Sequence, residues 1–296
     1  MVWQRQVVVG IASLAMLLAC GVSGCGGDST GGGPGRAASE TSTAEQPAGN
    51  GQAARRSPPA AGDPQSTAEI PAGKGLTALE EAAAAGEYVY VFFYTTEDEE
   101  TRTMRSGLAH ALRPMEGKVR VCEIDANDPA ESGVVSRLGA SGAPMPLVLA
   151  VAPNGAVTGG FPQRASTPEL LGAMVGPRTA ACLKALQNRK IVLACIQNPQ
   201  TAHNEEAMQG VRDFMADARF APLTESVLID PSDPEEQNLL NAVKVDPTST
   251  EAITVVMVPP ATALGQITGP TDKTAIEKVL RSRPTACTPG GACCPK

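Results

Sequence analysis

The sequence predicts an α/β protein with two successive domains, each a central mixed sheet flanked by helices. Strand-like and helix-like segments alternate in the same order in two halves of similar length. A motif also recurs at the same place in that order: residues 124–131 read IDANDPAE, and residues 229–236 read IDPSDPEE. A shared motif at a shared position in both halves indicates duplication. We therefore expect domains over residues 74–177 and 178–283.

The composition fits a globular protein and argues against nucleic-acid binding. Hydrophobic residues make up 42% of the 296 residues and charged residues 19%, which is ordinary for a folded chain. Aromatic residues are only 3%, so we expect a core of aliphatic side chains and methionine. A formal net charge of -7 provides no concentrated basic face, and a nucleic-acid partner is not expected.

Residues 1–25 predict an export signal of the lipoprotein type. Arg5 gives a positive start, and an almost entirely apolar run over 7–22 is followed by small residues. The run is too short and ends too abruptly to favour a membrane-spanning helix. The letters VSGC, ending at Cys25, resemble the lipobox of bacterial lipoproteins. That resemblance implies lipidation of the Cys25 sulfur. LLAC, ending at Cys20, is a poorer alternative, and an ordinary cleaved signal with incidental cysteines is the other.

A lipid anchor would place the protein outside the cytoplasm, attached to a bacterial membrane and facing the periplasm or the exterior. Residues 26–73 are dominated by Gly, Ser, Thr, Ala, Pro and Gln without an apolar period. Such a segment cannot bury enough apolar surface to offset its ordering entropy, so it predicts a disordered tether. As a flexible chain it would let the folded part range about 40 Å from the bilayer.

The first half contains segments of clear periodicity. Residues 88–94 (YVYVFFY) are rich in β-formers, and the apolar residues Met104, Leu108, Ala111 and Leu112 fall at helical spacing. Pro153-Asn154-Gly155 predicts a hairpin turn because Asn-Gly tolerates positive φ. We expect helices over 76–85 and 129–138, and another that carries the stripe from Met104 to Leu112. A last helix is expected to open at Thr167, with a capping hydroxyl there and Pro168 at the first helical position. Strands are expected over 88–94, 118–125, 146–152 and 156–161.

The second half repeats this order. We expect strands over 190–196, 225–230, 253–258 and 263–268, and helices over 203–218, 234–243 and 272–281. Met208, Val211 and Met215 lie on one face of the long helix. Pro259-Pro260 falls between the last two strands and is expected to disrupt their hairpin.

The element order resembles that of thioredoxin-like domains, clearly over 76–176 and more weakly over 178–283. In that family a cis-proline precedes a strand, and GAPMPLVL over 142–149 occupies this place, with Pro146 as the candidate. No proline precedes the corresponding strand at Ala252. The resemblance implies a groove for extended peptides around Pro146 and residues 97–100.

The cysteine pair that carries thioredoxin chemistry is missing. In the family, two cysteines lie two residues apart where the first strand meets the long helix, whose N-terminus lowers a thiol pKa. Here that place reads YTTEDEET over 94–101, with Glu97 and Glu100 near the two cysteine positions, and QNPQTAH over 197–203. We therefore expect neither domain to exchange disulfides, and the sequence favours a non-enzymatic role.

The acidic run over 97–100 has two interpretations. Carboxylates are oxygen ligands for Ca²⁺, but they also suit the N-terminus of a solvated helix. The calcium-loop spacing is absent, which favours the second interpretation.

The last residues read CTPGGACC and then PK, which places Cys287, Cys293 and Cys294 in a flexible tail over 284–296. Three hypotheses stay open: one disulfide with a third cysteine left over, a copper or zinc site, or a thiol pair that exchanges with a partner. Cys122 and Cys195 lie in predicted strands, where buried thiols are common. The environment of Cys182, in the helix between the repeats, is not readable from sequence.

Taken together, the sequence predicts a lipid-anchored envelope protein whose thioredoxin-like domains bind or scaffold a partner protein. The alternative is a protein that handles thiols or soft metals (copper or zinc) through Cys287, Cys293 and Cys294. Fold analogy alone cannot decide between them.

Overall fold

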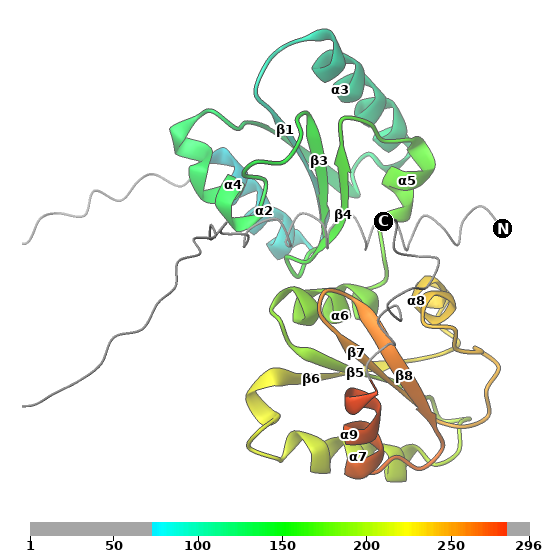
Figure 1. The fold of residues 1–296 in the computed structure, drawn as a ribbon. Coiled ribbons are helices and arrows are strands. Elements are labelled where there is room, and N and C mark those ends of the chain that lie inside the picture. Colours follow the sequence, from blue (N-terminus) through cyan, green and yellow to red (C-terminus); the bar gives the residue numbers. More distant parts are fainter. Residues whose placement is uncertain (1–72, 283–296) are drawn as a thin grey trace, which may run out of the picture. The chain divides into compact units, whose positions relative to one another are not determined.

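The structure, a computed structural model, describes residues 73–282 (Figure 1). The predicted signal peptide, most of the tether and the cysteine-rich tail lie outside the described residues. In the described part, no helix is long and apolar enough to cross a membrane. The elements, in chain order, are α2 (Lys74–Ala85), β1 (Tyr88–Tyr94), α3 (Glu99–Leu112), η1 (Arg113–Met115), β2 (Val119–Asp125), η2 (Pro129–Glu131), α4 (Ser132–Arg137), β3 (Leu147–Val151), β4 (Val157–Pro162), α5 (Thr167–Gly172), α6 (Pro177–Gln187), β5 (Ile191–Ile196), α7 (Asn204–Met215), η3 (Ala221–Leu223), β6 (Thr224–Ile229), α8 (Gln237–Ala242), β7 (Ile253–Val258), β8 (Thr262–Thr268) and α9 (Lys273–Arg281).

The strands form two sheets of identical topology. The first has the order β2-β1-β3-β4 and the second β6-β5-β7-β8. In the first, β1 pairs parallel with β2 and antiparallel with β3, which pairs antiparallel with β4. The second repeats this pattern. We call the first sheet with its helices the N-terminal domain and the second the C-terminal domain. The predicted fold class, two tandem mixed sheets flanked by helices, is confirmed.

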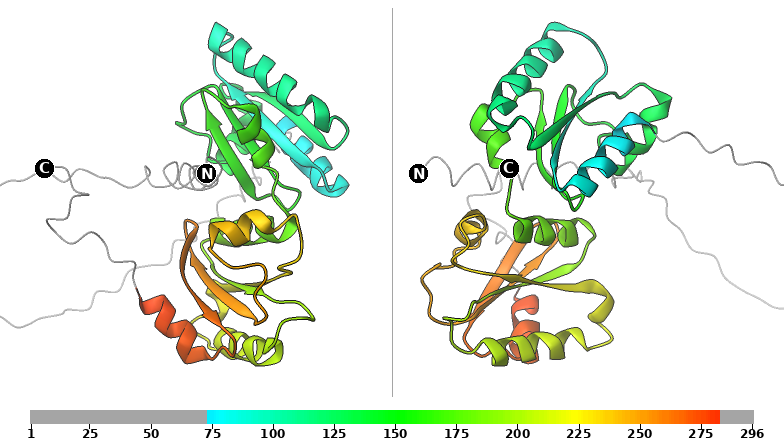
Figure 2. Two further views of the ribbon diagram at one scale, coloured as in Figure 1. Left: turned by 90° about the vertical axis from the view of Figure 1, so that its right-hand side faces the viewer. Right: turned by 180° about the vertical axis from the view of Figure 1, so that it is seen from behind.

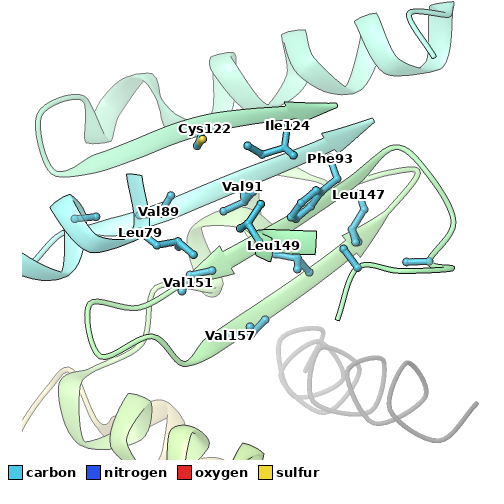
Figure 3. Packing of buried hydrophobic residues seen from close by; sticks show 14 residues of the cluster. Leu79, Val89, Val91, Phe93, Cys122, Ile124, Leu147, Leu149, Val151 and Val157 are labelled. Carbon is cyan, nitrogen blue, oxygen red and sulfur yellow. The ribbon is translucent and has the colours of Figure 1, made fainter. Parts of the chain in front are cut away.

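Helices cover both faces of the N-terminal sheet (Figure 2). On one face, side chains from α2 and all four strands meet, as Figure 3 shows for Leu79, Val91 and Ile124 among others. On the other face, Tyr90 and Phe92 pack against α3 and α5. Because β1 is buried on both faces, its side chains need no polar alternation. Each large apolar side chain buried here contributes about 1.5–3 kcal/mol.

The C-terminal sheet is covered in the same way. Side chains of α6 and α8 pack on one face, and those of α7 and α9 pack on the other. The predicted apolar stripe of α7 is confirmed, because Val211 is buried and Met208 and Met215 pack beside it.

A buried glutamate fixes the first helix of the N-terminal domain. Glu131, the last residue of the repeated motif, is only 3% exposed, and its Oε2 accepts a hydrogen bond from the backbone N–H of Gly75 at 3.0 Å. This carboxylate thus satisfies a donor at the start of α2 that has no partner within the helix. Gly73 provides the space for this carboxylate, since a Cβ at that position would collide with Glu131.

The C-terminal domain repeats this feature with more hydrogen bonds. Glu236 is fully buried and accepts from the N–H of Arg178 at 2.8 Å, the N–H of Thr179 at 2.9 Å and the Thr179 hydroxyl at 2.6 Å. These donors lie at the start of α6, where Gly176 again provides the space. We call each arrangement a glutamate cap. The repeated motif therefore encodes a contact between each domain's first helix and its second strand–helix connection.

Three expectations about local structure were wrong. Pro259-Pro260 does not disrupt the hairpin, because β7 and β8 pair up to Val258 and Thr262 around a cis peptide bond between the two prolines. The cap of α5 is Ser166, one residue earlier than expected, and it forms a reciprocal capping box with Glu169. The helix expected over 129–138 is the η2 turn followed by α4, and the one over 234–243 is shortened to α8.

Candidate functional site

The start of α3, where the family places its cysteines, is built from an aspartate and a threonine. Asp98 is the N-cap, and its Oδ1 accepts from the backbone N–H of Thr101 at 2.8 Å. Its Oδ2 accepts from the Thr96 hydroxyl at 2.8 Å. These hydrogen bonds, first the one from Thr101, lower the pKa of Asp98. Asp98 and Thr101 therefore bracket the first turn of α3.

Arg105 holds the loop that precedes α3. Its guanidinium binds both carboxylate oxygens of Glu97, at 2.6 and 2.9 Å, and its Nε donates to Glu123 at 2.8 Å. It also lies 5.4 Å from the ring centre of Phe92 and 5.3 Å from that of Tyr94. The hydrogen bonds from Arg105 lower the pKa of Glu97 and raise that of Arg105 itself. This loop, residues 95–98, is therefore tied to its own domain.

These contacts favour the helix-start interpretation of the acidic run over calcium binding. Asp98 caps the helix and Glu97 is bound to Arg105, while Glu99 and Glu100 are exposed in the first turn. Carboxylates at a helix N-terminus are stabilised by the unpaired N–H groups there. No cluster of His, Cys, Asp and Glu side chains suited to a metal ion occurs within residues 73–282.

The turn before β3 and this loop lie at the same end of the sheet, since Phe93 of β1 pairs with Leu147 of β3. The Met145–Pro146 peptide bond is cis, and Pro146 is buried while Pro144 is exposed and Met145 is half-buried. The Pro146 carbonyl accepts from the N–H of Gln163 at 2.6 Å. In the described part of the chain, no hydrogen bond joins residues 142–146 to residues 95–98. The two segments are held independently.

The corresponding segments of the C-terminal domain are joined. Ala202, in the loop before α7, donates its N–H to the carbonyl of Thr250 at 2.8 Å and accepts from the N–H of Ala252 at 2.9 Å. Asn204 also donates to the Asn198 carbonyl at 2.7 Å, which closes the loop on itself. We call the Ala202 contacts the Ala202 bridge. The backbone groups that stay apart in the N-terminal domain are therefore mutually paired here.

The described cysteines are free, and they belong to β2, α6 and β5 rather than to the first turn of α3 or α7. Cys182 and Cys195 are buried, and burial raises the pKa of each thiol to about 12. Cys122, in β2, is 9% exposed, and burial raises its pKa as well. Since the thiolate is the reactive form, these residues are suited to packing, as expected for Cys122 and Cys195.

The other cysteines named in the sequence analysis lie outside the described residues: Cys20, Cys25, Cys287, Cys293 and Cys294. Sequence reasoning missed Arg105 and the glutamate caps. The caps had a signal, because Glu131 and Glu236 occupy the same place in the repeated motif. No sequence signal marks Arg105, because its contacts with Glu97 and Glu123 depend on how α3 packs on the sheet.

A scan of protein-family models and a search of curated proteins found no match. Among solved structures, the oxidized thioredoxin O2 of Arabidopsis thaliana is 15% identical, over 34% of this chain and 84% of that chain, with a TM-score of 0.29. The N-terminal NTD_N/C domain of the alkylhydroperoxide reductase AhpF of Enterococcus faecalis is 16% identical, over 70% and 97%, with a TM-score of 0.24. The first two thioredoxin domains of Saccharomyces cerevisiae Eps1p are 9% identical, over 69% and 94%, with a TM-score of 0.27. The strand order and connections of the two sheets, β2-β1-β3-β4 and β6-β5-β7-β8, define the fold as two tandem thioredoxin-like domains.

Proposed function

We propose that this chain is a lipid-anchored lipoprotein of the bacterial cell envelope, whose thioredoxin-like domains bind or scaffold a partner protein without dithiol chemistry. The observation that supports the absence of dithiol chemistry is the Asp98–Thr101 pair at the start of α3, and the letters VSGC ending at Cys25 support the lipid anchor. An N-cap aspartate satisfies the helix donors that would otherwise stabilise a thiolate. The C-terminal domain offers Asn and Gln side chains and the Ala202 bridge in the same place.

The N-terminal domain is the better candidate for binding. Its turn at Met145 and Pro146 is free of hydrogen bonds to residues 95–98, and Pro144 and Met145 present apolar surface beside it. An extended peptide binds such a site by main-chain hydrogen bonds and side-chain contacts. In the C-terminal domain, the Ala202 bridge already uses the backbone groups of Thr250 and Ala252. Binding should therefore map to one domain.

Absence of dithiol exchange is tested by insulin reduction with the full chain in which Cys287, Cys293 and Cys294 are replaced by Ser. We expect no turnover above the uncatalysed rate. The matched variant Asp98→Cys with Thr101→Cys, in the same background, installs two thiols at the start of α3 and should gain measurable reduction. Turnover by the tail-Ser protein without the installed pair would refute the proposal.

Peptide binding is tested by NMR titration with a panel of extended, apolar peptides. Amide shifts should concentrate at residues 95–98 and 142–147, with residues 197–204 and 250–253 as the internal control. Shifts confined to the control segment, or none with any peptide, would count against binding at Met145 and Pro146.

The anchor has a separate test in cells of a bacterial host. Cys25→Ser should release the protein from membranes into the soluble envelope fraction, whereas Cys20→Ser should leave it bound. Membrane retention of Cys25→Ser would move the anchor to Cys20 or to the apolar run itself.

A second candidate function is thiol or soft-metal handling through the tail. The observation that favours it is the spacing of Cys287, Cys293 and Cys294 along a Gly/Pro-rich segment, while all three described cysteines are buried. Soft thiolates prefer Cu(I) or Zn²⁺. Metal analysis and a free-thiol count on the purified chain test this candidate: stoichiometric metal that is lost in Cys293→Ser with Cys294→Ser supports it, and one inert disulfide without metal removes it.

A further inference from the structure

A hollow lies at one end of the N-terminal sheet, between α2, the end of α4 and the turn that follows β3. It encloses about 520 Å³, part of which is open to solvent. Figure 3 shows Leu79, Val89 and Val151 grouped at this end of the sheet. Apolar side chains form most of the walls: Leu79, Ala82, Val89, Leu138, Val151 and Pro153. Walls of this kind favour an aliphatic side chain, which leaves water when it enters.

Three charged residues also line the hollow: Glu80, Glu87 and Arg137. Glu87 is bound to Arg120 of its own domain. Arg137 and Glu80 are exposed, and within residues 73–282 neither takes part in an ion pair. Glu80 belongs to α2 and Arg137 is the last residue of α4. The hollow therefore offers an unpaired cation on its α4 side, next to apolar walls.

The described chain begins close to this hollow. Gly73 lies against Ala130 and Glu131, so the residues before it leave the domain next to η2 and α4. From Gly73, the helix α2 rises about 9 Å to Leu79. Three extended residues span about 10 Å. A residue at position 70 therefore reaches the level of Leu79 when the chain turns back along α2.

Position 70 holds the one large apolar residue of the segment that precedes the domain. Over residues 26–72, every residue except Ile70 is Gly, Ala, Pro, a small or amide polar residue, or charged. Glu69 precedes Ile70 and Pro71 follows it. A proline restricts the residue before it to extended conformations, so fewer conformations are lost when Ile70 is bound. An aliphatic side chain and a carboxylate thus lie together, within reach of the hollow and Arg137.

We infer that Ile70 inserts into this hollow, with the Glu69 carboxylate beside the Arg137 guanidinium. Residues 69–72 then fold back along α2 of their own domain. The carboxylate approaches from the α4 side, because Glu80 repels it on the α2 side. Insertion covers apolar walls that are otherwise open to water. It also sets the point at which the predicted tether leaves the domain, which becomes residue 68 rather than Gly73.

The first test is methyl NMR of the full chain with labelled Ile, Leu and Val side chains. We expect nuclear Overhauser effects between the δ1 methyl group of Ile70 and the methyl groups of Leu79, Leu138 and Val151. Ile70→Ser should shift the signals of those three residues, whereas Ala68→Ser, a matched change two positions earlier, should leave them in place. An Ile70 methyl signal at its random-coil position, without contacts to the hollow, would overturn the inference.

The second test concerns the charged pair and takes the Ile70 methyl shift as the measure of the inserted fraction. Glu69→Gln and Arg137→Gln should each lower the ratio of inserted to free segment about two- to fivefold, the range of exposed ion pairs. The double variant should lose no more than either single variant. Glu80→Gln is the control and should not lower the ratio, since it removes an anion. Equal losses from Glu80→Gln and Arg137→Gln, or additive losses in the double variant, would refute the pairing.

Other occupants of the hollow would give different results. In a mixture of two differently labelled chains, the contacts of Ile70 should arise within one chain, and contacts between chains would replace the inference with an exchange between two copies. Native mass spectrometry of the purified chain checks for a bound small molecule. A molecule that is retained there, and whose removal is needed before Ile70 contacts the hollow, would also overturn the inference.

Discussion

The two domains have the same sheet, the same glutamate cap and different helix starts. In the N-terminal domain, α3 begins at a side-chain cap, and its loop is held by Arg105 while the Pro146 turn stays separate. In the C-terminal domain, α7 follows His203, whose side chain does not cap the helix. The Ala202 bridge joins the loop before α7 to the residues that precede β7. The two domains therefore share the buried carboxylate contact at the first helix and differ at the exposed end of the sheet.

The largest contrast should come from the glutamate caps. Glu236→Ala removes the acceptor of three hydrogen bonds from a fully buried site, and we expect it to lower the free energy of unfolding of the C-terminal domain by about 3–5 kcal/mol. Glu131→Ala removes one such bond and should cost the N-terminal domain about 1–3 kcal/mol. Urea unfolding followed by hydrogen exchange in each domain measures both values.

Isosteric substitutions control for the lost volume. Glu236→Gln keeps the size and part of the acceptor capacity, so its cost should lie between wild type and Glu236→Ala. An equal cost for the two alanine variants would mean that the hydrogen bonds do not set the difference between the domains.

Next in size is a contrast between two helix glycines. Gly210 of α7 is buried against the backbone of Thr271, where an added Cβ would collide, and Gly107 of α3 has open space around it. Gly210→Ala should destabilise the C-terminal domain by about 1–3 kcal/mol through overpacking. Gly107→Ala should stabilise the N-terminal domain by about 0.5–1 kcal/mol, because alanine has less conformational entropy to lose. Thermal unfolding of both variants checks the opposite signs, and a shared sign would contradict the comparison.

A smaller contrast separates the two helix starts. Asp98→Ala should lower the unfolding temperature of the N-terminal domain, because the N–H of Thr101 loses its acceptor. His203→Ala should leave the C-terminal domain nearly unchanged, since His203 caps nothing and alanine meets the same positive φ of 63°. Calorimetry of the two variants compares them directly, and a larger shift for His203→Ala would show that His203 has a structural role not visible in its contacts.

The smallest effect is the acid sensitivity of an ion-pair cluster in the C-terminal domain, in which Arg219 is exposed and Asp217 is half-buried. Asp217 binds Arg219 and Lys273 at 2.7 and 2.6 Å, and the hydrogen bonds from Arg219, then Lys273, lower its pKa below the ordinary 3.8. A lowered folded-state pKa stabilises the fold above the unfolded value, and this contribution is lost as the pH falls below about 4.

Asp217→Asn should therefore reduce the unfolding temperature at pH 7 and reduce it by a smaller amount at pH 2, because the contribution declines as the pH falls from about 4 toward the lowered folded-state pKa. Scans of wild type and variant at both pH values, at low and high salt, test this sign. A difference between wild type and variant that persists unchanged in acid would exclude the ionised Asp217 as its source.

Periodicity and repeated motifs predicted the parts of the fold that depend on local pattern. The stripe of Met104, Leu108, Ala111 and Leu112 is buried as expected, and the recurrence of the Asp-Pro motif reflects two sheets of one topology. The turn at Pro259-Pro260 was misjudged because both prolines lie in the connection between β7 and β8, where no N–H is needed for the ladder. The sequence could not decide whether Glu97 or Asp98 caps α3, because all four residues over 97–100 are acidic and the pattern looks the same from either start.

The contacts of Arg105 and of the two cap glutamates were missed for a different reason, although the repeated motif marks the positions of Glu131 and Glu236. Their partners are distant along the chain, 56 residues for Glu131 with Gly75 and 18 for Arg105 with Glu123. A charged residue in sequence normally indicates a solvated surface. Only the three-dimensional packing around α4 and α8 shows that the carboxylates of Glu131 and Glu236 are buried.

The length of chain enclosed by each glutamate cap has a consequence for the order of folding. The caps close loops of 56 and 57 residues. Closing each loop costs conformational entropy, so other contacts must bring its ends together before the cap can stabilise the domain. We expect the first helix of each domain to gain its full protection late, after the strands that follow it have paired. The earliest element along the chain would then be among the last to settle.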